Sequence, residues 1–120
     1  MIAMSEAESV HGQCDAAISL AFSILGKRWN GMIIDALSGG PLSFVELRRA
    51  VTGISDAVLS DRLTELAAAA LVARDVHPGP PLSVSYALTE GGEGLVPVLQ
   101  QLGGWASEHL VAPQRITADA

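Results

Sequence analysis

The chain has little cysteine, few aromatic residues and no long hydrophobic run. Its one cysteine, Cys14, cannot form a disulfide within the chain and is typical of a reducing, cytosolic compartment. Aromatic residues make up 4% of the sequence and hydrophobic residues 49%, so the core must be mainly aliphatic. No apolar run approaches the roughly 20 residues of a membrane span, and residues 1–11 lack the features of a secretion signal. We therefore expect a cytoplasmic protein without a membrane-spanning helix.

Positive charge is also scarce, but it is concentrated in one region. The formal net charge is -6, which at first argues against DNA binding, because contacts to phosphates need lysine and arginine. Six of the seven basic residues lie between Lys27 and Arg74, together with only five of the 13 acidic residues. The middle of the chain is therefore slightly basic, and any DNA binding should be salt-sensitive and not especially tight per monomer.

The sequence contains no recognisable catalytic or metal-binding pattern. It has no glycine-rich phosphate loop, no paired carboxylates on one predicted helix face and no defensible Cys/His arrangement. The three histidines lack metal-ligand spacing, and one cysteine does not make a zinc site. We expect neither an enzyme, nor a cofactor, nor a metal.

The apolar spacing predicts a single, mainly α-helical domain with two strands. We expect helices over residues 15–25, 28–37, 43–51, 55–70 and 90–110, and extended segments over 71–77 and 83–88. Pro97 lies inside the last helix, so its first turn is irregular or the regular helix starts near this proline. Residues 1–13 are expected to be a flexible arm, residues 14–110 the domain and residues 111–120 a C-terminal tail.

Two serines mark the starts of two successive short helices. Ser43, with Glu46 three residues later, forms a capping-box pattern. Ser55 caps the next helix after a turn that contains Gly53. The order of helix, turn, helix and two strands describes a winged helix-turn-helix, a module that places its second helix in the major groove of DNA.

The second of these helices carries small and polar residues away from its apolar stripe. The candidate DNA-reading residues are Ser55, Asp56, Ala57, Ser60, Asp61 and Thr64. Serine and threonine can bond to either base type, alanine can touch a thymine methyl, and aspartate can accept from cytosine N4. The alternative interpretation is an ordinary solvated helix face.

Basic residues near these helices are candidates for contacts to the DNA backbone. Arg48 and Arg49 lie on the first helix of the motif, where such contacts are expected, although one of them could be a solvated surface charge. Arg62 lies beside the apolar stripe and either reaches a phosphate or pairs with a carboxylate such as Glu46 or Glu65. Ser43, at the start of the first helix of the motif, is also a candidate DNA-binding residue.

Two further pairs of residues leave alternatives open. Lys27 and Arg28 either touch the flanking DNA backbone or form a structural ion pair. Trp29 and Trp105 belong either to core or dimer packing or to a small-molecule pocket between them.

Taken together, these motifs resemble those of a known family. They are Cys14, Gly26-Lys27-Arg28-Trp29, Phe44-Val45-Glu46-Leu47-Arg48-Arg49, Gly53-Ile54-Ser55, Leu59-Ser60-Asp61-Arg62-Leu63, Leu71-Val72-Ala73-Arg74 and Tyr86-Ala87-Leu88-Thr89-Glu90-Gly91-Gly92. From Cys14 to about Trp105 the chain resembles the HxlR-type transcriptional regulators, a branch of the MarR-like winged-helix group. The resemblance implies a homodimer through the first and last helices, an inverted-repeat operator and, in many members, an oxidant or electrophile response through the N-terminal cysteine.

The chain departs from the family pattern at three positions. The wing usually carries a basic residue where Ser83 stands, which leaves contact between the wing and DNA open. The usual glycine before Leu-Val is Ala70, which asks for a slightly different exit from the recognition helix. Asp15 replaces the proline that usually follows Cys14.

Cys14 has two interpretations. A lone cysteine in a small protein is usually a buried hydrophobe. Reactivity is favoured by a helix N-terminus, where Cys14 is expected, and disfavoured by the neighbouring Asp15. Without a second cysteine, a disulfide could form only between chains or with a small thiol.

The sequence thus predicts a dimeric, sequence-specific DNA-binding regulator, most simply a repressor. Its partners would be double-stranded DNA, a second copy of the chain, and an oxidant or small-molecule effector. The alternative is a winged-helix interaction module with little DNA affinity, which the net charge, Ser83 and the aspartates of the recognition helix support.

Overall fold

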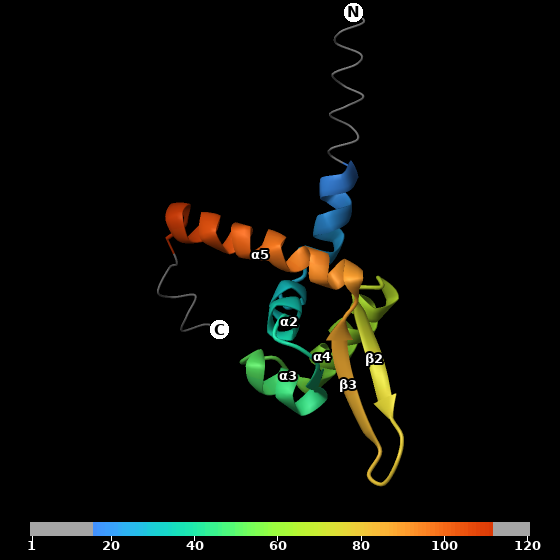
Figure 1. Cartoon of the computed structure of the whole chain (residues 1–120). Helices are drawn as coiled ribbons and strands as arrows, with labels where there is room; N and C mark the ends of the chain where they lie inside the picture. Colours follow the sequence, from blue (N-terminus) through green and yellow to red (C-terminus); the bar gives the residue numbers. More distant parts are fainter. Residues whose placement is uncertain (1–15, 112–120) are drawn as a thin grey trace, which may run out of the picture.

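The structure is a computed structural model of the chain, and it describes residues 16–111. The predicted arm, most of the predicted tail and Cys14 lie outside the described residues. Residues 16–25 are helical. The elements that follow are α2 (Asn30–Leu37), β1 (Leu42–Ser43), α3 (Phe44–Ala50), α4 (Asp56–Ala68), β2 (Val72–His77), β3 (Ser83–Leu88) and α5 (Glu90–His109). The predicted order of helices and strands is confirmed, and the fold is mainly helical with one small antiparallel sheet (Figure 1).

The sheet has three strands in the order β1-β3-β2. β2 and β3 form an antiparallel hairpin from Val72 opposite Leu88 to His77 opposite Ser83, and it projects beyond the helices as a wing (Figure 1). β1 was not predicted, because two residues are too few to show an alternating pattern. It pairs Leu42 with Tyr86 and thereby fixes the start of α3 against the base of the wing.

The core is aliphatic, as the composition predicts. Its buried hydrophobic residues are Ile33, Ile34, Leu37, Leu47, Val51, Ile54, Leu59, Leu63, Leu66 and Val72. They come from α2, α3, α4, the turn between α3 and α4, and β2, so one side of α2 packs against the DNA-binding motif. Replacing one of the fully buried leucines by alanine should cost about 2–5 kcal/mol of folding free energy.

Side-chain caps define the start of three helices. The Ser43 hydroxyl accepts from the Glu46 amide at 3.1 Å and the Glu46 carboxylate accepts from the Ser43 amide at 2.8 Å, which confirms the predicted capping box. Ser55 accepts from the Val58 amide at 3.2 Å, and Thr89 caps α5 in the same way. Local sequence signals therefore place both helices of the DNA-binding motif.

The helix α5 runs without interruption from Glu90 to His109, with Pro97 inside it. The start of α5 is fixed by tertiary contacts rather than by the proline. The Thr89 amide donates to the Leu71 carbonyl at 3.1 Å, and the Thr89 hydroxyl donates to the Ala70 carbonyl at 2.6 Å. A start near Pro97 is therefore wrong, because these bonds anchor α5 to the end of α4 two turns earlier.

The backbone at the end of α4 also differs from the prediction that Ala70 would change its path. Ala70 has a φ of 61°, a left-handed conformation that glycine favours. The Leu71 amide donates to the Leu66 carbonyl and the Ala70 amide to the Ala67 carbonyl, each at 3.0 Å, which together form a Schellman motif. The alanine therefore adopts the backbone of a glycine exit instead of changing the path, and we expect it to be strained.

Candidate DNA-binding surface

The outer face of α4 has the character expected of a recognition surface. Leu59, Leu63 and Leu66 are at most 3% exposed and hold one side of the helix against the core. The candidate residues on the remaining surface, all exposed, are Ser55, Asp56, Ala57, Ser60, Asp61 and Thr64. The Thr64 hydroxyl donates to the Ser60 carbonyl at 3.0 Å, which leaves its oxygen as an acceptor. The structure thus brings the predicted reading residues onto one solvent-facing helix.

Arg48 and Arg49 occupy different electrostatic settings at the end of α3. One terminal nitrogen of Arg48 donates to both carboxylate oxygens of Asp56, at 3.0 and 3.1 Å, and this pair links α3 to the first turn of α4. Within residues 16–111, Arg49 has no carboxylate at ion-pair distance. Arg49 is therefore the freer cation for a phosphate, although Arg48 lies beside the same surface.

The carboxylate of Glu46 interacts with Ser43 and Arg49 of the same motif. The Ser43 amide and, to a smaller extent, the Ser43 hydroxyl lower the pKa of the Glu46 carboxyl by hydrogen bonding, and Arg49 contributes a charge effect. Because the hydroxyl of Ser43 accepts from the Glu46 amide and also interacts with the Glu46 carboxylate, a DNA contact by this hydroxyl would compete with its role at the start of α3.

Arg62 has its carboxylate partners within α4. Its side chain is 18% exposed, and its terminal nitrogens lie 3.5 Å from oxygens of Glu65 and Asp61. Of the alternatives left open by the sequence, pairing with Glu65 is the one that the geometry shows. Contact of Arg62 with a phosphate stays a prediction, and it would require the side chain to turn outward.

Glu65 joins α4 to the first helix and α2. Its carboxylate pairs with Lys27 and accepts from the Asn30 side-chain amide at 2.9 Å. The same amide donates to the Ile24 carbonyl at 2.9 Å, and Asn30 is fully buried. The Lys27 hydrogen bond, followed by that of Asn30, lowers the pKa of the Glu65 carboxyl. Lys27 is therefore a structural ion-pair partner.

The basic residue of the wing does not lie at the position of Ser83, where the family pattern usually has one. Ser83 is exposed beside the hairpin turn and lies opposite His77. The basic residue of the wing is Arg74 on β2, which lies opposite Tyr86 and was not among the predicted site residues. The signal was available, because Arg74 follows the apolar Val72 at the spacing of two that places both side chains on one face of a strand.

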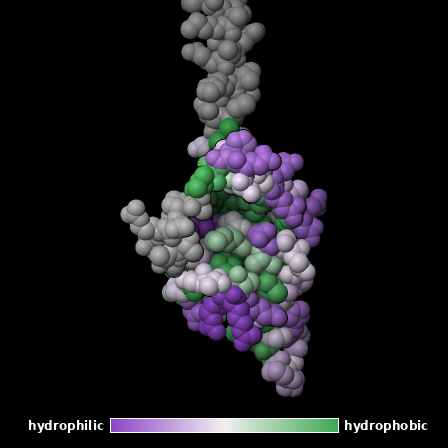
Figure 2. All heavy atoms as spheres, turned by 90° about the vertical axis from the view of Figure 1, so that its left-hand side faces the viewer, coloured by the Kyte–Doolittle hydropathy of each residue, from purple (hydrophilic) through white to green (hydrophobic). Residues whose placement is uncertain are grey.

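The terminal helices expose large apolar residues. They are Ile18, Leu20, Phe22, Val98, Leu102 and Trp105, and each is 45–72% exposed. Figure 2, a view toward the side at which α5 ends, shows hydrophobic residues around a hollow in the middle of this face. Exposed apolar surface that gathers on neighbouring elements is typical of a contact with another protein chain.

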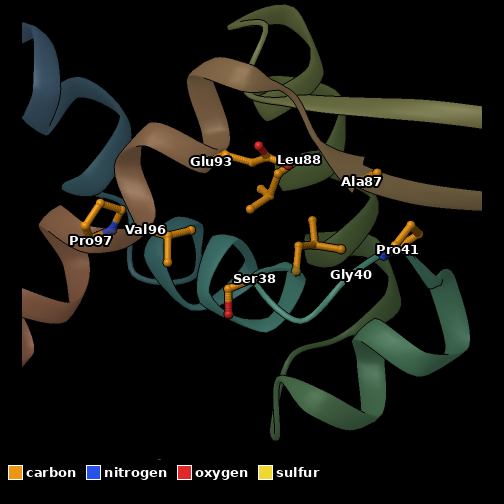
Figure 3. A pocket seen from close by; sticks show the side chains of 9 residues that line it. Ser38, Gly40, Pro41, Ala87, Leu88, Glu93, Val96 and Pro97 are labelled. Carbon is orange, nitrogen blue, oxygen red and sulfur yellow. The ribbon is translucent and has the colours of Figure 1, made fainter.

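Two cavities border α5. One, of about 410 Å³, lies between α2 and α5, and neither Trp29 nor Trp105 lines it. The other, of about 370 Å³, lies where α2, β3 and α5 meet, with Ser38 and Pro41 on one side and Glu93 and Pro97 of α5 on the other (Figure 3). Trp29 packs against the core and Trp105 is 51% exposed, so the structure does not join them in one pocket.

No helix within residues 16–111 has both the length and the apolar character needed to cross a bilayer. The histidine, cysteine and acidic residues in this part of the chain form no group of three that could hold a metal ion.

Comparison with known proteins places these features in a family. The family described as HxlR-like helix-turn-helix matches residues 24–114. The HTH-type transcriptional regulator YodB of Bacillus subtilis is 46% identical over 88 residues, which cover 73% of this chain and 79% of YodB. YvaP of the same organism, an uncharacterised HTH-type transcriptional regulator, is 41% identical over 73% of this chain and 82% of its own length.

Solved structures agree with the sequence relatives. The reduced form of YodB has a TM-score of 0.73 at 42% identity and covers 78% of this chain and 92% of that structure. The redox regulator HypR in its oxidised form has a TM-score of 0.73 at 29% identity and covers 80% of this chain and 99% of that structure. The chain therefore belongs to the HxlR-like helix-turn-helix family, and it is a DNA-binding transcriptional regulator with a MarR-like winged-helix fold.

Proposed function

We propose that the chain is a sequence-specific repressor that binds an inverted-repeat operator as a homodimer. The observation that carries this proposal is the exposed, small and polar outer face of α4, held in place by three buried leucines. A helix with short side chains can approach base edges closely in the major groove. Arg49 at the end of α3 would hold the neighbouring backbone, and the wing would lie beside the groove.

Dimerisation would use the helix over residues 16–25 and α5. Both helices leave large side chains such as Phe22 and Trp105 more than half exposed. A two-fold axis through this surface would present two α4 helices to the same side of the DNA. Their half-sites should then lie about one helical turn, or 34–36 Å, apart.

The regulatory signal would enter through Cys14, outside the described residues. YodB has been solved in a reduced form and after diamide treatment, and HypR is a redox regulator. We propose that an oxidant such as diamide takes two hydrogens from two Cys14 thiols, one in each chain, and leaves a disulfide between them. The contacts of Glu65 and Asn30 would then carry a shift of the first helix to α4, because they join the Ile24 carbonyl to the recognition helix.

A small-molecule inducer is the second route that the structure favours. The cavity of about 370 Å³ in Figure 3 joins the end of α2 and the wing to the first turns of α5. A ligand there would contact both the DNA-binding motif and the proposed dimerisation helix. Its occupation would change the spacing of the two α4 helices.

The test is a fluorescence anisotropy titration of purified protein with DNA from upstream of its own coding region, at two salt concentrations. The titration is repeated with and without diamide. We expect salt-sensitive binding by a dimer, lost on oxidation and retained in the oxidised Cys14→Ser variant. Loss of binding on oxidation in both proteins would contradict thiol sensing. If neither this DNA nor duplexes selected from a random pool bind, the chain is an interaction module without DNA affinity.

A further inference from the structure

A third cavity, with several polar groups in its lining, lies between the recognition helix and the wing. It measures about 430 Å³ and is lined by Ser60, Leu63, Thr64 and Ala67 of α4 and by Arg74 and Tyr86 of the wing. Its polar groups are therefore hydroxyls and one guanidinium. No acidic residue lines it.

The strand register explains why Arg74 faces this cavity. Val72 is 3% exposed and lies opposite Leu88, which packs against the core. Alternation along a strand puts Arg74 and its partner Tyr86 on the same face as these two residues, one step farther from the core. The neighbouring acid, Asp75, belongs to the opposite face. The wing therefore presents a cation to α4 at the point where the core ends.

Within the described part of the chain Arg74, like Arg49, lacks the carboxylate partner that several other cations of the molecule have. Arg48 and Arg62 each lie within 3.5 Å of a carboxylate oxygen, and Lys27 is paired with Glu65. Among residues 16–111, Arg74 has no carboxylate at ion-pair distance, and the hydroxyls of Ser60 and Tyr86 make no hydrogen bond with another described residue. A free guanidinium beside hydroxyl donors suits an anion with several acceptor oxygens, such as a phosphodiester.

We propose that Arg74 and Tyr86, with Ser60 of α4, form a seat for one phosphate of the DNA backbone. This inference rests on the proposed DNA-binding function. A helix in the major groove has a sugar-phosphate strand on each side, so a site between α4 and the wing lies where a backbone phosphate passes. The seat would give the wing a charged contact to a phosphate, which the neutral Ser83 at the hairpin turn could not supply.

The test compares Arg74→Ala, Arg74→Lys and Tyr86→Phe with wild type by fluorescence anisotropy. The probes are a duplex selected from random DNA and an unrelated duplex of equal length. Arg115→Ala, which removes the same charge outside the described residues, is the control for net charge. Ser85→Ala removes a hydroxyl from the opposite face of the same strand and is the control for Tyr86→Phe. Thermal unfolding of each variant checks the fold.

For each protomer of the proposed dimer, Arg74→Ala should weaken binding to both duplexes by about tenfold, the effect of one hydrogen bond to a charged group. Because the dimer carries two copies of Arg74, the slope of log affinity against log salt should fall by about 2, or about 1 per protomer. Arg74→Lys should retain the slope and lose part of the affinity, and Tyr86→Phe should weaken binding without a change in slope. A scan of methylphosphonates along the DNA should find one phosphate in each half-site whose neutralisation weakens the wild type but not Arg74→Ala.

Failure of the seat and failure of the proposed function are distinguishable. Wild-type affinity and slope in Arg74→Ala, or a changed base preference with an unchanged slope, would overturn the seat and leave DNA binding intact. The seat would also be overturned if every methylphosphonate affected the wild type and Arg74→Ala equally. A wild-type protein that binds none of the selected DNA would overturn the proposed function itself.

Discussion

In α4 the leucines Leu59, Leu63 and Leu66 are buried and the exposed residues are short, half of them polar, whereas in α5 the large apolar residues Leu102 and Trp105 are 45% and 51% exposed. The recognition helix finds its apolar partners within the same chain, in α2, α3 and β2. The long helix finds such partners only along its first half. The DNA-binding motif is therefore complete within one chain, and the terminal helices present an exposed apolar surface, which is where we propose that a second copy binds.

The largest effect should come from a charge placed on the exposed surface of α5. Leu102→Glu should convert the proposed dimer to monomers, because an apolar contact would then have to bury a carboxylate. Affinity for an inverted repeat should fall on the order of 100-fold, since two linked modules bind far more tightly than one. Sedimentation gives the oligomeric state and anisotropy the affinity.

Leu82→Glu is the matched control for the oligomeric state, because Leu82 is 66% exposed on the wing and lies away from the terminal helices. It should leave sedimentation unchanged. A Leu102→Glu protein that still sediments as a dimer would show that the contrast between α4 and α5 has another cause.

Gly92→Ala should destabilise the junction between α5 and the end of α4 through a steric clash. A Cβ at Gly92 would lie 2.2 Å from the Leu71 carbonyl oxygen, so α5 would have to move away from the end of α4. Overpacking of this kind costs about 1–3 kcal/mol of folding free energy. In Gly94→Ala, on the same helix, the added Cβ meets nothing within 4 Å, and this control should match or exceed wild type in urea unfolding. Equal stability of both variants would show that the close approach at Leu71 does not constrain α5.

Within the DNA-binding half, Arg49 and Asp61 should have different roles. Arg49→Ala should weaken binding to all duplexes and lower the salt slope by about 1 per protomer, or about 2 for the proposed dimer, because it removes one phosphate contact from each protomer. Asp61→Ala, at a side chain that is 77% exposed, should instead change the selected base pattern. Anisotropy and repeated selection measure the two properties. If the two variants behave identically, Arg49 and Asp61 do not have the separate roles of contacting the DNA backbone and reading the base sequence.

Ala70→Gly should stabilise the junction at which α4 leads into the wing. The left-handed φ of 61° is strained for alanine, and relief of that strain should exceed the larger entropy of glycine in the unfolded chain by about 0.5–1 kcal/mol. Ala69 has a φ of -82°, so Ala69→Gly is the control and should not be stabilising. Urea unfolding compares both variants with wild type, and a destabilised Ala70→Gly protein would contradict the strain.

The smallest effect should appear at acid pH in the contacts between α4 and the first helix. Hydrogen bonds from Lys27 and Asn30 lower the pKa of Glu65 in the folded state. Its stabilising contribution is therefore present above the unfolded pKa of about 4.3 and is lost as the pH falls through the folded pKa. The free energy of unfolding of Glu65→Gln should depend less on pH than that of wild type below about pH 5. Parallel pH profiles would show that the ionised Glu65 does not stabilise this junction.

Signals that act within a few residues could be predicted from the sequence. The pairing of Ser43 with Glu46 and the leucine spacing of α4 determine local structure, and both are confirmed. Contacts between distant segments could not be predicted. A start of α5 near Glu90 was predicted, but the effect of Pro97 on it was left open, and the bonds from Thr89 to Leu71 and Ala70 that anchor this start join α5 to the end of α4.

The candidate site shows the same limit. The outer face of α4 follows from helical periodicity, but the partner of Lys27 depends on how α2 packs against α4. Arg74 was not predicted as a site residue, because the family pattern places the cation of the wing at the position of Ser83. The spacing of two from Val72 places Arg74 on the inner face of its strand, but the position of that face against α4 depends on how the wing packs in the folded chain.

Selection of duplexes from a random pool by the purified wild-type protein, followed by anisotropy of the enriched DNA at two salt concentrations, tests most directly whether α4 reads sequence. We predict an enriched inverted repeat with half-sites about one helical turn apart, bound by a dimer with strong salt dependence. Selection without enrichment, or weak binding that is equal for all sequences, would contradict sequence-specific recognition and favour an interaction module with a winged-helix fold.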